Sequence, residues 1–386
     1  MSATQLSSRR MSGALVGYGF ISGNGHVPAY LERERTTDDV EIIAVADICP
    51  ARRELARKAL PHARIYPDYT SLLQAEASRL DFVDISVPPC DHAKVAHAAF
   101  DHGLHVLCEK PLTTTLEDAA ALLEHARRAR RVLFPCHNYK HAPVAKKVRE
   151  IIDSGRIGKV RALTLNTFRN THAKGVTEWH THWRREHRYS GGGIAMDHGS
   201  HSFYLTFDWM SAYPTAVTAK MSNLEPERWD TEDNFSATLT FPTGVAYAQL
   251  TWTAGVRKVM YTVQGDQGAI TIDDDDLQLA VMRRTDGPDV AQGAVTWEVE
   301  KYSIASHWMD ASHVSWFNSM FDQFLVAIRD GDFVGKDARE AYLCIQIITQ
   351  AYRSAADGCR EKPLSAEAWN LPQVPMEKDQ GLRLGR

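Results

Sequence analysis

Apolar and polar positions follow one pattern in the first third of the chain. From residue 12 to about 135, short apolar runs alternate with segments whose apolar residues recur at helical spacing. The apolar runs occupy residues 14–16, 41–47, 81–87, 105–112 and 131–136. The segments with helical character begin near His26, Pro50, Asp91 and Thr114, the last opened by a Thr114-x-x-Glu117 capping box. Because buried strands that alternate with helices are typical of a doubly wound parallel sheet, we predict an α/β fold here.

The pattern changes after a further predicted helix at residues 144–154. Several of the runs that follow alternate apolar and polar residues, as strands with one buried and one exposed face do. These runs occupy residues 160–167, 216–221, 235–241, 245–252, 259–264 and 269–272. Residues 316–329 and 338–355 return to helical spacing. This part predicts an α+β domain with a large, open-faced, mostly antiparallel sheet.

The length of the chain also favours two domains, because 386 residues are too many for one ordinary core. We predict a disordered lead-in at residues 1–11 and the parallel-sheet domain at residues 12–137. The α+β domain is predicted at residues 138–365, and a C-terminal arm at residues 366–386.

The composition argues against several classes of function and location. The net charge of −4 gives no support for binding nucleic acid or an anionic membrane. No apolar run approaches the length needed to span a bilayer, and the N-terminus lacks the apolar core of a signal peptide. The six cysteines are scattered without a Cys-x-x-Cys pair, so we expect buried thiols and a reducing, cytoplasmic location.

A glycine turn follows the first apolar run. Gly17-x-Gly19 comes directly after the strand, and the third position of the dinucleotide fingerprint is Ser22 instead of glycine. Gly17 permits a tight turn, and Gly19 lets the main chain approach a diphosphate that a helix N-terminus attracts. These residues alone fit a dinucleotide site and an ordinary turn about equally well.

An acid at the end of the second strand favours the dinucleotide interpretation. Asp47 closes the run 41–47, where a carboxylate can accept hydrogen bonds from ribose hydroxyls and so favour NAD over NADP. Asp47 lies about 30 residues after Gly17, more than the usual spacing of about 20. Arg52 and Arg53 are close enough in sequence to bind a ribose phosphate instead, which leaves NADP open.

A lysine stands at the carboxyl end of a later predicted strand, in the motif Glu109-Lys110-Pro111. Open α/β sheets bind their ligands at this edge. A lysine there can hydrogen-bond a substrate hydroxyl and stabilise negative charge that develops on its oxygen. An isolated Lys-Pro is also common as a surface lysine before a helix, so the motif alone leaves both interpretations open.

Asp197 and His201 are four residues apart in a predicted helix, after the glycine run at residues 191–193. Residues at this spacing share a helix face, so the carboxylate and the imidazole can pair. Such a pair raises the basicity of the histidine and fixes its tautomer, which suits a general base. A purely structural Asp–His pair explains the spacing equally well.

Residues 169–188 are rich in histidine and arginine. His180-x-His182, together with His198 and His201, suggests a zinc site, but the spacing matches no common zinc motif and we predict no metal. A polar substrate loop explains the segment better, and its cationic excess points to an anionic substrate group. An ordinary solvated loop is almost as good an explanation.

Taken together, these residues resemble the Gfo/Idh/MocA family, named for glucose–fructose oxidoreductase and inositol dehydrogenase. The resemblance extends from about residue 12 to residue 365. Its landmarks, in order, are Gly17-x-Gly19, Asp47, Val87-Pro88-Pro89 with His92, Glu109-Lys110-Pro111, His137-Asn138, Gly155–Val160, Trp183-Arg184, Ser190–Gly193, Asp197-x-x-x-His201 and Gly265-x-x-Gly268. One departure is that the glycine turn is one residue longer before His26 than is usual in the family.

The resemblance implies an NAD(P)-binding Rossmann domain, a substrate-binding and oligomerisation domain, and hydride transfer with a secondary hydroxyl of a sugar, sugar derivative or cyclitol. It implies catalytic roles for Lys110, which holds the hydroxyl, His201, which takes its proton, and Asp197, which orients the imidazole. The expected cofactor-binding residues are Gly17, Gly19, Phe20, Ile21, Asp47, Ile48, Ser86, Val87, Pro88, His92, Glu109, Lys110, Asn138, Trp183 and Arg184. The expected substrate-binding residues are Lys110, Tyr139, Arg169, His172, His180, His182 and His198.

Two other activities stay open within the same family. A relative can use bound NAD for transient oxidation while it hydrolyses a glycosidic bond, with no net redox change. Another can keep the fold and sense a sugar or a dinucleotide without catalysis, although such a protein has no need of a proton relay. The resemblance also implies a homodimer or homotetramer.

Overall fold

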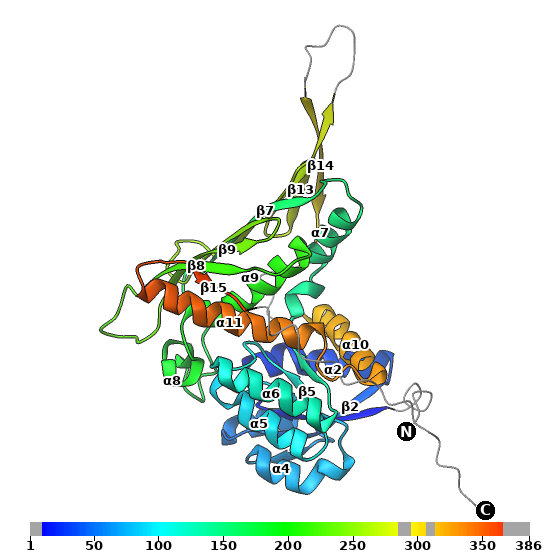
Figure 1. Cartoon of the computed structure of the whole chain (residues 1–386). Coiled ribbons are helices and arrows are strands. Elements are labelled where there is room, and N and C mark those ends of the chain that lie inside the picture. The colour runs from blue at the N-terminus through cyan, green and yellow to red at the C-terminus, as the bar shows by residue number, and fades with distance from the viewer. Residues whose placement is uncertain (1–9, 285–294, 306–312, 366–386) are drawn as a thin grey trace, which may run out of the picture.

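The computed structural model describes residues 10–284, 295–305 and 313–365, which form two β-sheets with helices packed around them (Figure 1). The first sheet has six parallel strands in the order β3-β2-β1-β4-β5-β6, which confirms the predicted doubly wound sheet. Its strands are β1 (Met11–Val16), β2 (Val40–Ala46), β3 (Arg64–Tyr66), β4 (Phe82–Ile85), β5 (His105–Cys108) and β6 (Leu133–Pro135). The three-residue strand β3 was not predicted, because so short an edge strand leaves little apolar pattern.

The helical segments that cover this sheet are η1 (Ser22–His26), α2 (Val27–Thr36), α3 (Pro50–Ala59), α4 (Tyr69–Glu76), η2 (Ala77–Arg79), α5 (Pro89–Asp101) and α6 (Leu116–Ala129). Helix α2 begins at Val27, close to the predicted start near His26, and the π-helical segment η1, which was not predicted, directly precedes it. One predicted helix start needs correction. Helix α6 is capped by Thr115, whose hydroxyl accepts from the N–H of Asp118, one residue later than predicted.

The second sheet has nine strands in the order β14-β13-β12-β11-β7-β10-β9-β8-β15. Only β7 and β10 pair in parallel, so the predicted mostly antiparallel sheet is confirmed. The strands are β7 (Val160–Phe168), β8 (Ala216–Ser222), β9 (Asn234–Phe241), β10 (Gly244–Thr251), β11 (Lys258–Gly265), β12 (Gly268–Asp273), β13 (Asp276–Arg284), β14 (Val295–Ser303) and β15 (Lys362–Pro363). The prediction missed β13, β14 and β15; β14 is largely exposed along its length and so shows no buried alternation.

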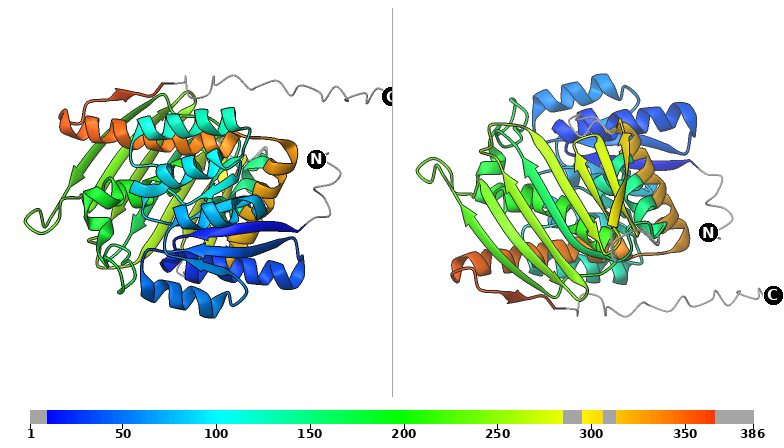
Figure 2. Two further views of the ribbon diagram at one scale, coloured as in Figure 1. Left: turned by 90° about the horizontal axis from the view of Figure 1, so that it is seen from below. Right: turned by 90° about the horizontal axis from the view of Figure 1, so that it is seen from above.

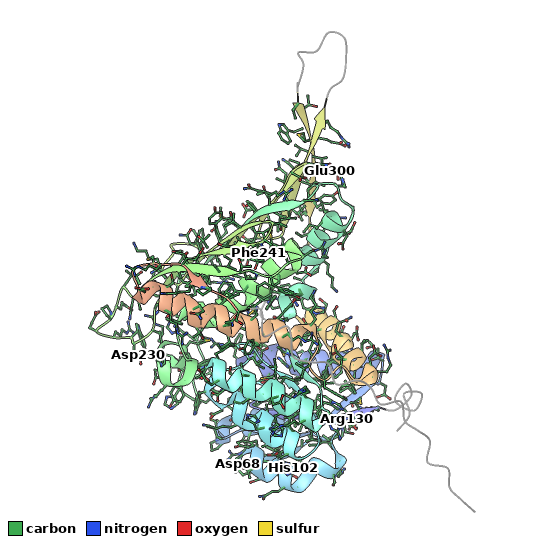
Figure 3. The ribbon with its side chains drawn as sticks, viewed as in Figure 1. Asp68, His102, Arg130, Asp230, Phe241 and Glu300 are labelled. Carbon is green, nitrogen blue, oxygen red and sulfur yellow. The ribbon has the colours of Figure 1, made fainter. Side chains whose placement is uncertain are left out.

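Helices cover one face of the second sheet, and the other face is open. In the right-hand view of Figure 2 the strands of this sheet lie in front of the helices. Tyr247 and Met260 on the open face are 47% and 40% exposed. In Figure 1, β13 and β14 extend beyond the other strands, and Glu300 on β14 (Figure 3) pairs with Arg156 at 3.0 Å.

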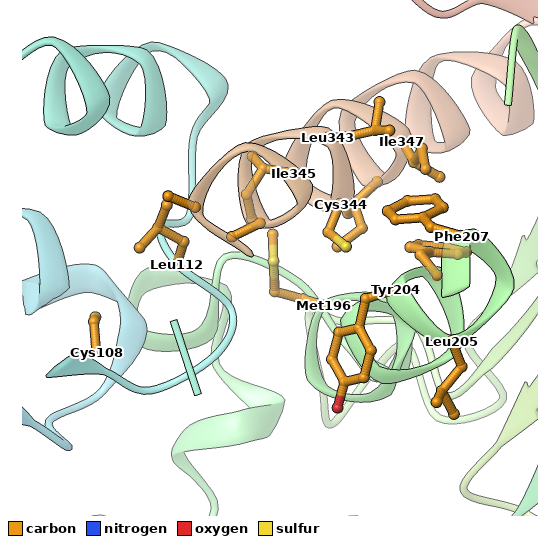
Figure 4. Close-up of a cluster of buried hydrophobic side chains, with 14 of the residues drawn as sticks. Cys108, Leu112, Met196, Tyr204, Leu205, Phe207, Leu343, Cys344, Ile345 and Ile347 are labelled. Atoms are coloured by element: carbon orange, nitrogen blue, oxygen red, sulfur yellow. The ribbon is translucent and has the colours of Figure 1, made fainter. Parts of the chain in front are cut away.

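The remaining helical segments are η3 (Asn138–His141), α7 (Pro143–Asp153), η4 (Trp183–Arg185), α8 (His187–Ser190), α9 (Ile194–Met210), α10 (Val314–Asp330) and α11 (Lys336–Ala356). Helix α10 belongs to the predicted second domain but packs on the first sheet, where Phe317 and Phe324 join the core of Leu15 and Phe82. Helix α11 packs against α9, and Figure 4 shows their buried side chains in one cluster. This packing fixes α9 relative to the first sheet.

The chain ends and the cysteines complete the comparison with the sequence. Strand β1 begins at Met11, the last residue of the predicted lead-in, and residues 1–9 and 366–386 lie outside the described residues. All six thiols are free, and four are buried; Cys90 is half-buried and Cys359 is exposed, contrary to the expectation that all are buried. None of the described helices is both long enough and apolar enough to cross a membrane.

Candidate active site

A cavity of about 690 Å³ lies at the carboxyl end of the first sheet and is closed by α9 and the segment after β7. Ligand pockets usually measure about 300–1,000 Å³. The strand ends contribute Gly17, Asp47, Ser86 and Glu109 to the lining, and α9 contributes Asp197. This is the edge at which parallel sheets present their loops to ligands.

The glycine turn leaves space in this cavity. Gly17 has φ +94°, and a Cβ atom there would lie 2.8 Å from the backbone of Ser86. The Ser22 hydroxyl donates to the Gly17 carbonyl at 2.6 Å and holds the turn in place. A Cβ atom on Gly19 would meet nothing within 4 Å, so Gly19 borders open space. The turn therefore has room for a diphosphate beside its main chain.

Asp47 lines the cavity, and the backbone holds its carboxylate. Oδ2 accepts from the N–H of Tyr18 at 2.6 Å and Oδ1 from the N–H of Cys49 at 2.7 Å. Burial raises the pKa of Asp47 in spite of these hydrogen bonds. Arg52 also lines the cavity and donates from Nε to the Tyr18 carbonyl, whereas Arg53 donates to the carbonyls of Asp47 and Ile48 and does not line it.

The structure brings all but one of the predicted cofactor-binding residues to the cavity. Those that line it are Gly17, Gly19, Phe20, Ile21, Asp47, Ile48, Ser86, Val87, Pro88, Glu109, Lys110, Asn138, Trp183 and Arg184. His92 is the exception, because its ring is buried behind the lining. The two ring nitrogens lie 2.9 Å from the carbonyls of Pro111 and Val87, so this histidine holds two cavity loops together.

A buried charged network lies behind the cavity and was not predicted. His26 Nδ1 is 2.7 Å from Asp84 Oδ2, His26 Nε2 is 3.0 Å from Glu109 Oε1, and the Tyr30 hydroxyl donates to Asp84 at 2.7 Å. Burial alone would lower the pKa of His26, but the two carboxylates raise it to about 10. His26 is therefore an imidazolium that neutralises charge beside Glu109. Its position in the π-turn, which no common motif describes, places it there.

Helix α9 begins where a buried carboxylate meets its free N–H groups. Glu232 accepts from the N–H groups of Gly193 and Ala195, both at 2.9 Å, and from the Tyr352 hydroxyl at 2.8 Å. A carboxylate at a helix N-terminus satisfies free donors and favours the helix dipole. This cap sets where the first turn of α9, with Asp197, meets the cavity.

The side chains of Lys110, Arg184 and His198 all contact Asp197. Lys110 Nζ donates to the Asp197 carbonyl at 2.7 Å and lies 3.4 Å from Oδ1, and Arg184 Nε donates to Oδ1 at 3.2 Å. His198 Nδ1 lies 3.2 Å from Oδ2. Burial would raise the pKa of Asp197, but the charges of Lys110 and Arg184 hold it well below its ordinary value. Asp197 is thus a carboxylate that positions Lys110.

The predicted pair between Asp197 and His201 is wrong. No hydrogen bond joins them in the described part of the chain, because the carboxylate is turned to Lys110, Arg184 and His198. His201 Nδ1 instead lies 2.5 Å from the hydroxyl of Tyr204, and the ring stacks on Tyr139 at 3.8 Å between centroids. Burial, followed by the charge of Lys110, keeps the pKa of His201 well below its usual range. His201 is therefore neutral and lines the cavity.

The predicted substrate-binding residues divide into two groups. Lys110, Tyr139, Arg169, His172 and His198 line the cavity. His180 and His182 do not, because their rings contact other side chains: His180 lies 3.3 Å from the Tyr189 hydroxyl, and His182 lies 2.9 Å from His172. Burial and the neighbouring His182 lower the pKa of His172 to about 4.

These histidines also do not converge as metal ligands. Within the described ranges, the groups of side chains close enough to bind one ion are His26 with Glu109 and Cys136, and His137 with Asp337 and Glu340. The ammonium group of Lys140 already occupies the second of these sites, because its Nζ lies 2.7 Å from Asp337 Oδ1.

Several lining residues were not predicted. Arg257 directly precedes β11, Trp252 directly follows β10, and His313 is the N-cap residue of α10; the fold brings all three to the cavity. None belongs to a motif. The signal for Arg257 would have been the pairing of β7 with β11, which the sequence pattern does not specify.

Two family profiles match the chain. Residues 11–137 match "Oxidoreductase family, NAD-binding Rossmann fold", and residues 145–271 match "GFO/IDH/MocA C-terminal domain". The chain is 35% identical over 158 residues to D-apiose dehydrogenase of Paraburkholderia graminis; this match covers 41% of the chain and spans 40% of that relative's length. It is 22% identical over 381 residues to D-glucoside 3-dehydrogenase of Escherichia coli, covering 92% of the chain and 98% of the relative.

Solved structures share the fold. Levoglucosan dehydrogenase in complex with NADH and L-sorbose is similar with a TM-score of 0.78 and 21% identity, over 92% of this chain and 99% of that one. GenD2 from gentamicin A biosynthesis, in complex with NAD, is similar with a TM-score of 0.75 and 24% identity, over 93% of this chain and 97% of that one.

Proposed function

Because the chain belongs to the GFO/IDH/MocA family of oxidoreductases, with its NAD-binding Rossmann domain, we propose that it is a dehydrogenase acting on a secondary hydroxyl of a sugar, sugar derivative or cyclitol. The observation that carries the proposal is that Lys110 and His201 line the same cavity as the glycine turn. The relatives named D-apiose dehydrogenase and D-glucoside 3-dehydrogenase support a sugar-like substrate.

The cavity residues fit a dinucleotide. Gly19 borders open space, and the buried Ser86 hydroxyl has no hydrogen-bond partner among the described residues. Asp47 supports NAD, since its oxygens keep lone pairs for ribose hydroxyls, while Arg52 leaves NADP as the alternative. When bound, the nicotinamide supplies the hydride acceptor or donor.

His201 takes the proton of the substrate hydroxyl. The Tyr204 oxygen already accepts the Tyr139 N–H at 3.2 Å, and it can accept Nδ1–H of His201 as well. This tautomer leaves the Nε2 lone pair for the substrate hydroxyl. Tyr204 is thus a positioning residue in the role that the sequence assigned to Asp197. Lys110, held by Asp197, donates to the hydroxyl oxygen and stabilises its developing charge.

A screen of sugars and polyols with NAD and NADP, followed by nicotinamide absorbance, tests this function. His201→Ala should lower kcat/KM by about 10²–10⁴-fold, since that is the usual contribution of a general base. NAD affinity should change less than about twofold, because His201 lies on the substrate side. His187→Ala, an exposed histidine outside the cavity, is the control.

The pH profile adds a second readout. Because the pKa of His201 lies well below 6.5, the base form persists at neutral pH, and kcat/KM should fall only at more acidic pH. Near-normal turnover of His201→Ala at every pH contradicts the assignment. Sugar release without accumulation of NADH would indicate the redox-neutral glycosidase instead.

Self-association is the remaining part of the proposal. The open face of the second sheet exposes Tyr247 and Met260, which supports a homodimer or homotetramer paired through this face. Light scattering of the purified protein measures the mass, and a monomer at micromolar concentration contradicts this part.

A further inference from the structure

Arg169 and Arg257 both line the cavity, and the charge of Arg169 acts on Arg257. Arg169 directly follows β7 and Arg257 directly precedes β11, whose last paired residues are Phe168 and Lys258. Arg169 Nη1 lies 3.4 Å from the carbonyl of Lys258, the residue after Arg257. Like charges held close together repel each other. The pair is therefore a cost to the fold unless something else compensates it.

No described residue compensates this charge. Arg169 is buried and donates from Nη1 to the carbonyls of Phe168 and Lys258, at 2.9 and 3.4 Å, which leaves its Nε and Nη2 without a partner among the described residues. Arg257 makes no hydrogen bond or ion pair within the same residues. Partial burial and the charge of Arg169 both lower the pKa of Arg257.

The carboxylates near this pair are committed elsewhere. Asp274 lies within electrostatic reach of Arg257, but its Oδ1 accepts the Val259 N–H at 2.8 Å and it does not line the cavity. Asp197 is held by Lys110 and Arg184. Arg169 and Arg257 therefore give this side of the cavity a net positive charge.

The two arginines lie near His201, the proposed base. Tyr139, which stacks on His201, is within electrostatic reach of Arg257, and Arg169 acts on His198. A ligand group bound by the two arginines would therefore belong to the same molecule as the hydroxyl at His201.

We propose that Arg169 and Arg257 bind a carboxylate of the substrate, so that the enzyme oxidises a sugar acid in preference to the neutral sugar. This inference rests on the proposed dehydrogenase function. The free Nε–Nη2 edge of Arg169 and the whole fork of Arg257 match the two oxygens of a planar carboxylate. Their contribution is to orient the substrate as well as to attract it.

Calorimetry on the NAD-loaded full chain tests binding apart from catalysis. Hexuronates and aldonates are titrated against the matched neutral sugars and polyols and against glucose 6-phosphate. The variants are Arg257→Gln and Arg257→Lys. The control is Arg161→Gln, because Arg161 lies on β7, the strand before Arg169, and pairs with Asp266 away from the cavity. Kinetics on the same panel follow nicotinamide absorbance.

We expect at least one sugar acid to bind at least about tenfold more tightly than its neutral partner. Arg257→Gln should remove this preference, mainly through KM, and Arg257→Lys should restore part of it, since it keeps the charge without the fork. Arg161→Gln should retain it. No preference for any acid, an equal loss in Arg161→Gln, or tighter binding of the phosphate overturns the proposal. Binding of an acid without any turnover would instead contradict the proposed function and leave the anion site standing.

Discussion

The polar groups in two parts of the cavity are paired in different ways. We call the part lined by the glycine turn, Asp47 and Glu109 the cofactor half, and the part lined by His201, Arg169 and Arg257 the substrate half. In the cofactor half, the protein supplies the partners: Asp47 accepts two backbone N–H groups, and Glu109 is neutralised by His26. In the substrate half, Arg257 and the Nε2 atom of His201 have no partner among the described residues, although both residues line the cavity. In the first half the charged groups are paired within the chain, although the Ser86 hydroxyl is not, whereas in the second half charged groups also lack a partner among the described residues.

This difference separates what holds the fold from what selects the substrate. A buried charge that has its partner contributes a rigid, pre-set surface, and losing the partner destabilises the whole domain. A charge that lacks a partner is a cost to the fold and is available for binding. Substitutions in the cofactor half should therefore act on stability and cofactor affinity, and those in the substrate half on substrate affinity and turnover.

The largest effect is expected from His26→Leu. This change leaves Asp84 and Glu109 buried without their cation, and breaking a buried ion pair in this way costs about 3–5 kcal/mol of unfolding free energy. Chemical denaturation measures the loss. His62→Leu, at an exposed position, is the control and should change stability by less than about 0.5 kcal/mol.

The pH dependence sharpens the same test. Folding raises the pKa of His26 from 6.5 to about 10, so its stabilisation is complete below pH 6.5 and is lost as the pH rises through about 10. The wild-type protein should lose stability across this window, and His26→Leu should not show that loss. A wild-type stability that is constant from pH 6.5 to 10 would mean that His26 is not charged in the folded protein.

Gly19→Ala should separate cofactor affinity from folding. A Cβ atom at Gly19 enters open space, so the melting temperature should stay the same. If a diphosphate occupies that space, the added methyl group costs about 2 kcal/mol of binding, or about thirtyfold in the Kd for NAD. Gly17→Ala is the contrast, because its Cβ would lie 2.8 Å from the Ser86 backbone and should lower stability too. Unchanged NAD affinity in Gly19→Ala would place the diphosphate elsewhere.

Asp47→Ala tests the choice between NAD and NADP. The change removes a carboxylate that can accept from ribose hydroxyls, so the NAD/NADP ratio of kcat/KM should fall by about tenfold. The backbone hydrogen bonds of Tyr18 and Cys49 are lost as well, and the ratio cancels any general loss of stability. An unchanged ratio removes Asp47 from cofactor selection.

The sequence predicted most elements that bury one face, among them helix α11 and strands β7 to β12. The exception is β13, which was missed although its Leu277, Leu279 and Val281 are buried. The prediction also failed at β14, which is exposed along most of its length, and at the π-turn Ser22–His26, where one added residue widens the first helical turn. Helix α10 was predicted as an element, but its packing on the first sheet depends on a long-range contact that no local pattern records.

The site was predictable in its residues and less so in its pairings. Lys110, Asp197 and His201, to which the resemblance gave catalytic roles, all line the cavity, and their roles stay a prediction. The spacing of Asp197 and His201 placed them on one helix face but could not show that Lys110 and Arg184 compete for the carboxylate. Arg257 was missed because only the pairing of β11 with β7 brings it to Arg169.

The smallest effect is expected where the two halves of the cavity meet. The segment after β7 reaches back to the first domain, where Glu178 lies 3.5 Å from Arg52 and its carbonyl accepts from the Cys49 thiol. Glu178→Gln keeps the backbone contact and removes the charge; the pair is 3.5 Å long and its Glu178 side is open to solvent, so its contribution should be small. NAD dissociation should therefore accelerate by about twofold at most, in stopped-flow displacement.

The dependence of NAD dissociation on salt distinguishes loss of the Arg52–Glu178 ion pair from a general loosening of the segment after β7. Added salt screens an exposed ion pair, so wild-type NAD dissociation should accelerate with ionic strength, whereas Glu178→Gln should respond less. Glu186→Gln is the matched control, because it breaks a pair with Arg188 on the same segment without touching the first domain. An equal effect of both variants would show that the segment moves as a whole and that the two halves are not joined through Arg52.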